Sequence, residues 1–91
     1  MPSWTVSIAP RAVKAVRRAP RQEREQLRHA LDKLAEDPSA GDVVPLKNER
    51  AAFRRRFGDW RIFFDLYPTD RLVEVVDIAR RTTTMYRKRR R

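Results

Sequence analysis

Residues 51–66, AAFRRRFGDWRIFFDL, constrain the fold of this chain more than any other stretch. They contain two runs in which apolar residues recur at alternate positions, and the Gly-Asp pair between the runs favours a tight turn. This pattern predicts an antiparallel hairpin with strands over 51–57 and 60–67. The first strand carries three consecutive arginines. Arginine is seldom fully buried unless it is paired, so these side chains need either solvent or an anionic partner.

The rest of the chain supplies helices and further strands. The other predicted elements are a strand over 3–9, a helix from Pro10, a helix over 20–37 and a strand over 71–79. Pro20 separates the two helices, because proline is tolerated only in the first turn of a helix. Residues 37–45 are rich in Asp, Pro, Ser and Gly and are predicted to form a loop.

The predicted order is strand, helix, helix, strand, strand, strand. Amphipathic helices and a sheet with one apolar face bury their apolar surfaces most simply against each other. We therefore predict an α+β fold in which both helices pack on one face of a small, antiparallel-rich sheet. The other face is expected to stay open to solvent. The 91 residues fit one domain, which we assign to residues 1–87, and the basic residues 88–91 are predicted to form a flexible tail.

The charge of the chain indicates an anionic partner. Lysine and arginine number 22 against 12 aspartate and glutamate residues, a formal net charge of +10. Such an excess attracts nucleic acid, acidic proteins or anionic surfaces. The chain has no cysteine and one histidine, so no metal and no cofactor are expected. No apolar run approaches the ~20 residues of a membrane span and no signal peptide is evident, so we expect a cytoplasmic protein without membrane partners.

Strand alternation divides the arginines of the predicted hairpin between two faces. Arg54 and Arg56 share one face, and Arg61 joins them if Trp60 faces the helices. Arg55 falls on the opposite face with the two phenylalanines of its strand, where an arginine is out of place. Guanidinium groups bind phosphates through paired N–H donors and stay charged at any working pH. The open face is therefore predicted to bind the phosphates of a nucleic acid.

Three segments of the sequence resemble one known family. PLKN at 45–48, FRRRFGDWRIFFDL at 53–66 and VEVVDIARRTTTMYR at 73–87 are similar to segments of the RelE/ParE toxin superfamily. The most specific part is the fixed order of basic, glycine and aromatic positions at a hairpin, and the resemblance spans nearly the whole chain. It implies the fold predicted above. It also implies the toxin of a type II toxin–antitoxin pair, with a cognate antitoxin as its partner.

RelE-like members of this superfamily cut messenger RNA in the ribosomal A site, so the resemblance implies ribosome and mRNA as further partners. The implied chemistry is metal-independent: the RNA 2′-hydroxyl attacks the adjacent phosphate while cations stabilise the developing charge. The implied catalytic residues are Arg61, Arg80, Arg81 and Tyr86, with the choice between the two adjacent arginines open. The implied RNA- or phosphate-binding residues are Arg54, Arg56, Lys88 and Arg89.

Other functions stay open. ParE-like members of the superfamily act on DNA gyrase, so a gyrase inhibitor without nuclease activity is one alternative. A non-catalytic nucleic-acid-binding domain is another, and a solvated basic strand edge that discourages edge pairing needs no ligand at all. Arg54 and Arg56 also stand where some members carry lysine. A guanidinium is a poor general base because it hardly deprotonates.

Overall fold

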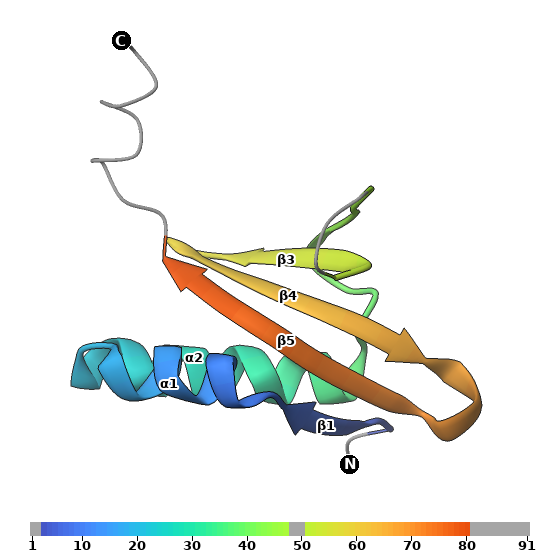
Figure 1. The fold of residues 1–91 in the computed structure, drawn as a ribbon, viewed down its shortest axis with the longest axis horizontal. Helices are drawn as coiled ribbons and strands as arrows, with labels where there is room; N and C mark the ends of the chain where they lie inside the picture. Colours follow the sequence, from blue (N-terminus) through green and yellow to red (C-terminus); the bar gives the residue numbers. More distant parts are fainter. Residues whose placement is uncertain (1–2, 48–50, 81–91) are drawn as a thin grey trace, which may run out of the picture.

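The computed structural model describes residues 3–47 and 51–80, and Figure 1 shows their arrangement. The elements are β1 (Thr5–Ile8), α1 (Pro10–Arg18), α2 (Arg21–Glu36), β2 (Asp42–Pro45), β3 (Phe53–Phe57), β4 (Trp60–Tyr67) and β5 (Leu72–Arg80), with a 3₁₀ turn at Pro68–Asp70. The predicted tail at 88–91 lies outside the described residues, so it stays a prediction.

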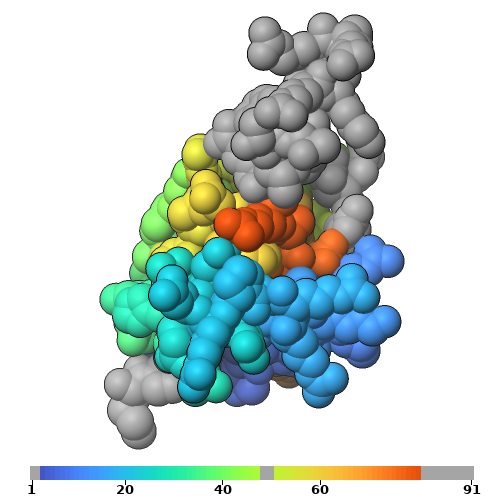
Figure 2. Space-filling model, turned by 90° about the vertical axis from the view of Figure 1, so that its left-hand side faces the viewer, coloured from blue at the N-terminus to red at the C-terminus, as the bar shows by residue number. Residues whose placement is uncertain are grey.

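The strands form one sheet in the order β1-β5-β4-β3-β2. β1 runs parallel to β5, and the other neighbouring pairs are antiparallel. Both helices lie on one side of the sheet, below β4 and β5 in Figure 1. Figure 2 shows α1 and α2 side by side beneath the ends of these strands. The two-layer α+β fold predicted from the sequence is confirmed.

Prolines set the boundary between the two helices. Pro10 lies at the start of α1, and Pro20 precedes α2 in an extended conformation. Ala19 is also extended, with φ −69° and ψ 148°, because a proline disfavours the helical region in the residue before it. α1 therefore ends at Arg18, and the chain turns directly into α2.

The core lies between the helices and the sheet. It is built from small and aliphatic residues of the helices and from alternate residues of β4 and β5. The buried members are Ala12, Ala19, Leu27, Ala30, Leu34, Trp60, Ile62, Phe64, Val73, Val75 and Ile78. Full burial of a large apolar side chain contributes roughly 1.5–3 kcal/mol. The helical spacing of Leu27, Ala30 and Leu34 is the apolar stripe that predicted α2 from the sequence.

Residues 42–45 form the edge strand β2, where the sequence pattern predicted a loop. β2 pairs antiparallel with β3, from Asp42 opposite Arg56 to Pro45 opposite Phe53. The strand has only four residues, too few for an alternation that distinguishes it from a loop. Its ladder hydrogen bonds are with β3, so only tertiary pairing makes it a strand. Proline, which lacks a backbone N–H, fits at the end of an edge strand.

Arg55 faces the helices, as the alternation predicted, and is buried there. It is 9% exposed and lies opposite Ile62. Its Nε and Nη1 atoms have no hydrogen-bond partner among the described residues. The guanidinium packs against Gly41, where an added Cβ would lie 2.9 Å from Nη2 and where φ is +85°. Both the contact and the left-handed backbone therefore require glycine at this position.

Replacing Arg55 by methionine is expected to stabilise the protein. The change removes two buried N–H donors that have no acceptor among the described residues, and it keeps an unbranched apolar side chain over Gly41. An unsatisfied buried donor costs about 1–3 kcal/mol, and the free energy of unfolding in urea should rise by a similar amount. Arg56→Met, on the exposed open side of the same strand, is the matched control and should change little. A lower urea midpoint for Arg55→Met would contradict the interpretation.

Candidate functional site

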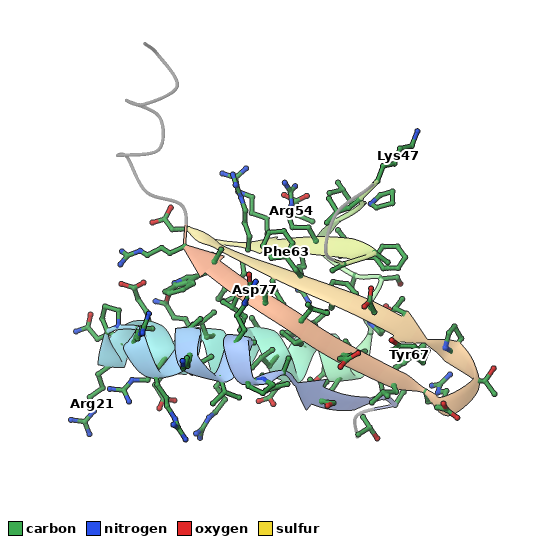
Figure 3. The ribbon with its side chains drawn as sticks, viewed as in Figure 1. Arg21, Lys47, Arg54, Phe63, Tyr67 and Asp77 are labelled. Carbon is green, nitrogen blue, oxygen red and sulfur yellow. The ribbon has the colours of Figure 1, made fainter. Side chains whose placement is uncertain are left out.

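The face of the sheet turned away from the helices, which we call the open face, carries Arg54, Arg56 and Arg61. Arg56 and Arg61 are direct cross-strand partners on β3 and β4, and Arg54 is the partner of Phe63. Figure 3 shows Arg54 above the sheet, on the side away from α1 and α2. All three arginines thus lie on the face that strand alternation predicted for them.

These arginines concentrate positive charge in a small area. Opposed side chains on neighbouring strands have Cβ atoms about 4.5–5.5 Å apart, and like charges in such pairs are destabilising. Among the described residues, Arg61 forms no ion pair with Asp59 or Asp65. The cluster can therefore receive an anion, because guanidinium groups from two strands present paired N–H donors to one phosphate.

The other end of the open face is acidic. Asp65 and Glu74 are cross-strand partners there. Asp65 Oδ1 accepts a hydrogen bond from the Ala52 N–H at 2.7 Å, and Glu74 Oε1 accepts one from the Tyr67 hydroxyl at 3.4 Å. The negative charge of Glu74 raises the pKa of Tyr67. This polarity directs an anionic ligand toward the arginine end of the face, beside the β3–β4 turn.

Arg80 lies on the helix side of the sheet, not on the open face. It is the cross-strand partner of the core residue Trp60. Arg80 Nη2 forms an ion pair with Glu23 Oε2 at 3.2 Å, and its guanidinium carbon lies 5.8 Å from the centroid of the Trp60 ring. Glu23 Oε1 accepts a hydrogen bond from Trp60 Nε1 at 2.9 Å. This cluster anchors the end of β5 to the start of α2 and separates Arg80 from Arg61.

A register shift in β5 decides which side chains reach the open face. Simple alternation along β5 would group Asp77 with Val73 and Val75, which face the helices, and would send Arg80 to the open face. The pairing shifts between Phe63 and Phe64, so that Asp77 becomes the partner of Phe63 on the open face. The aspartate within an apolar run was visible in the sequence. The face that this aspartate occupies depends on the register shift, which the sequence pattern does not reveal.

The remaining predicted site residues are Arg81, Tyr86, Lys88 and Arg89. They lie outside the described residues, so their catalytic and RNA-binding roles stay predictions.

A groove of about 550 Å³ lies between the two helices and β1. Its apolar lining consists of Val6, Ile8, Val13, Val16, Leu31 and Ala35. The charged residues around it are Arg17, Arg21, Arg24 and Arg28, with Glu25 and Asp32. Figure 3 shows Arg21 at the start of α2, pointing away from the sheet. An apolar groove with a mainly basic border fits an amphipathic segment with acidic flanks.

The sequence of residues 6–85 matches the family model described as the ParE toxin of the type II toxin–antitoxin system parDE. This range includes both helices, the arginine-bearing hairpin and all of β5. The chain belongs to the ParE toxin family. It is a type II toxin of the RelE/ParE superfamily, as the resemblance of its sequence motifs implied. Among curated proteins, none matches the chain.

Solved RelE structures share the fold of this ParE-family chain. The archaeal RelE–RelB complex from Pyrococcus horikoshii OT3 contains a chain with TM-score 0.75 and 22% identity, covering 89% of this chain and 98% of that chain. The RelBE2 toxin–antitoxin complex from Mycobacterium tuberculosis contains a chain with TM-score 0.78 and 20% identity, and the match covers 89% of this chain and 94% of that chain. The isolated E. coli RelE toxin has a TM-score of 0.72 and 18% identity, and the match covers 94% of each chain.

The described part of the toxin has neither a cluster of metal ligands nor a membrane-spanning helix. Within residues 3–47 and 51–80, no three His, Asp or Glu side chains are grouped as ligands for a metal ion. No helix in these residues is long and apolar enough to cross a membrane.

Glu23→Ala is expected to destabilise the toxin, because it removes the acceptor of the Trp60 indole and the partner of Arg80. Loss of the acceptor of a partly buried donor costs about 1–3 kcal/mol, which urea denaturation would measure. Glu25→Ala is the matched control, since it removes an exposed acid from the same helix start. If both variants lose the same free energy of unfolding, the effect comes from the helix dipole and not from the contacts of Glu23.

Proposed function

We propose that this toxin cuts messenger RNA on the ribosome. The observation that carries the proposal is the open face, where Arg54, Arg56 and Arg61 come together from two strands. Cleavage of RNA through its own 2′-hydroxyl needs cations around one phosphate, and guanidinium groups supply them without a metal. The acidic opposite end of the same face, at Asp65 and Glu74, favours one placement of the RNA backbone over others.

In the proposed reaction the 2′-hydroxyl attacks the adjacent phosphate in line, and charge builds up on a five-coordinate phosphorus. Arg61 stabilises this charge, while Arg54 and Arg56 hold the phosphate from the neighbouring strand. A preorganised donor aimed at developing charge contributes roughly 3–4 kcal/mol, by analogy with oxyanion holes. Holding the RNA in an in-line geometry lowers the barrier further.

The position of Arg80 bears on the choice between the two adjacent arginines. Its guanidinium pairs with Glu23 at 3.2 Å on the helix side of the sheet, away from the proposed phosphate. This supports a structural role for Arg80 and favours Arg81 as the residue that donates toward the leaving 5′-oxygen. Tyr86 is proposed to stack on a base, and Lys88 and Arg89 to contact the RNA backbone.

Brief induction of the toxin in growing cells tests this function. Primer extension on a reporter mRNA should show cuts at defined positions within translated codons for the wild type. Arg61→Ala should reduce cleavage by about 10²-fold or more, the cost of losing one preorganised donor. Arg18→Ala removes an equal charge from the exposed last turn of α1 and should cut like the wild type.

A second candidate function, inhibition of DNA gyrase, is favoured by the match to the ParE family model. In the same experiment, intact mRNA together with growth arrest and DNA damage would contradict mRNA cleavage and support gyrase inhibition. Intact mRNA without a growth defect would instead point to a non-catalytic nucleic-acid-binding domain.

We also propose that a cognate acidic antitoxin docks in the groove between the helices. The similar chain from Pyrococcus horikoshii was solved in a RelE–RelB complex, and the one from Mycobacterium tuberculosis in a toxin–antitoxin complex. The apolar lining and arginine-rich border of the groove suit the apolar face and acidic flanks of an amphipathic helix. The net charge of +10 accelerates the encounter with such a partner.

Reversing charge at the groove border is expected to weaken antitoxin binding. Arg24→Glu combined with Arg28→Glu should lower the affinity for the antitoxin encoded beside this toxin by at least about tenfold, or 1.4 kcal/mol. Calorimetric titration measures the affinity, and the free variant should still cut mRNA. Arg18→Glu, which is not part of the groove lining, is the control. Unchanged affinity in the double variant would place the antitoxin on another surface.

A further inference from the structure

Asp77 is a nearly buried carboxylate on the open face. It is 7% exposed and is the cross-strand partner of Phe63. Figure 3 marks Asp77 on β5 and Phe63 on the neighbouring strand β4. Aspartate is rarely buried to this degree unless it is engaged by other groups, because a charge removed from water is costly.

A β-bulge places Asp77 on this face and holds it there. Pairing passes from Phe63–Asp77 to Phe64–Val75, so Val76 is the extra residue on β5. Asp77 Oδ1 accepts a hydrogen bond from the Ile78 N–H at 2.8 Å, which fixes the orientation of the carboxyl group. Bulges re-aim side chains and recur beside active sites. This one brings a carboxylate to the face that holds the arginines.

The arginines lie on two sides of Asp77. Arg61 is diagonally across from it on β4, since Arg61 pairs with Ala79, and Arg54 lies beyond Phe63 on β3. Diagonal cross-strand residues are about 7–8 Å apart, a distance that a guanidinium, a phosphate and a carboxylate can bridge together. The carboxylate also offsets part of the charge that the arginines bring together.

Cleavage through the 2′-hydroxyl requires a group that accepts its proton. Arginine cannot do so, because its guanidinium hardly deprotonates, whereas a positioned carboxylate can act as a general base. We infer that Asp77 is the general base of this toxin. The inference rests on the proposed mRNA cleavage and deepens it.

In this step the Asp77 carboxylate takes the proton of the 2′-hydroxyl while the 2′-oxygen forms a bond to phosphorus. The bond from phosphorus to the 5′-oxygen breaks with its electron pair, and the leaving oxygen receives a proton from water. The products are a 2′,3′-cyclic phosphate and a free 5′-hydroxyl. The hydroxide left behind takes the proton from Asp77 and restores the carboxylate, so protons and charge balance over one turnover.

Two other carboxylates of the open face, Asp42 and Asp65, are less suitable. Asp42 stands opposite Arg56 on the edge strand β2, on the side away from Arg61, and is exposed to solvent. Asp65 holds the Ala52 N–H at 2.7 Å at the acidic end of the face. Asp42 provides the matched control, since it shares the charge and the face of Asp77 without its position.

The decisive experiment is single-turnover cleavage of mRNA on ribosomes with an empty A site, using the full-length toxin. Asp77→Asn keeps the volume and an oxygen acceptor for the Ile78 N–H but removes the basic carboxylate. We expect its cleavage rate to fall by about 10²- to 10⁴-fold, with ribosome affinity unchanged and cooperative unfolding in urea retained. Asp42→Asn should cleave at the wild-type rate.

A modified substrate separates a lost base from other defects. An mRNA with sulfur in place of the bridging 5′-oxygen has a leaving group that departs without protonation. Asp77→Asn should stay slow on this substrate, because the 2′-hydroxyl still has to lose its proton. Recovery of the wild-type rate would overturn the assignment, since it would place the defect at the leaving group.

The other outcomes of the single-turnover experiment also decide whether Asp77 is the general base. Cleavage by Asp77→Asn at the wild-type rate would show that the carboxylate only stabilises the bulge, and would overturn the inference while the nuclease function stands. Absence of cleavage by the wild type would overturn the function and the inference together. If Asp77→Asn fails to fold, Asp77→Ser, which retains a small acceptor for the Ile78 N–H, takes its place under the same criteria.

Discussion

The burial of β4 against the helices is the interaction on which the rest of this structure depends. Ile62 and Phe64 have no exposed surface and Trp60 has 6%. Each contributes roughly 1.5–3 kcal/mol, which exceeds the ~0–1 kcal/mol of an exposed ion pair. Because side chains alternate along a strand, the buried set leaves only the open face for Arg61. A slip of one residue would bury Arg61 and expose Ile62, so the core also holds the candidate site in register.

The two-layer architecture gives the toxin two separate surfaces. The sheet presents arginines on the open face, and the helices form an apolar groove with β1 on the other side. Glu23 connects the two layers, since it lies in the first turn of α2 and contacts both Trp60 and Arg80 at the end of the sheet. A partner seated on the helices and an RNA on the sheet would therefore contact different residues of one domain.

The arginines of β3 show that charge placement here opposes stability. Arg56 faces Arg61 directly, an arrangement that destabilises a strand pair. Arg55 lies in the core, and its Nε and Nη1 donors have no acceptor among the described residues. The two cases have different explanations. Arg56 and Arg61 on the open face can bind an anion, whereas Arg55 contacts Gly41 and binds no ligand in the proposed function. Local rules of stability are commonly broken at functional sites, and only the first case fits that explanation.

Local patterns in the sequence determined the order of the elements, the apolar stripe of α2 and the face of Arg54, Arg56 and Arg61, because helical and strand periods are properties of short segments. Strand β2 required its partner β3, since four residues carry no readable period. The faces of Asp77 and Arg80 required the bulge between β4 and β5, which shifts the alternation by one residue. A bulge arises from how two distant strands pair, so only the tertiary structure could decide which of these side chains meets the arginines.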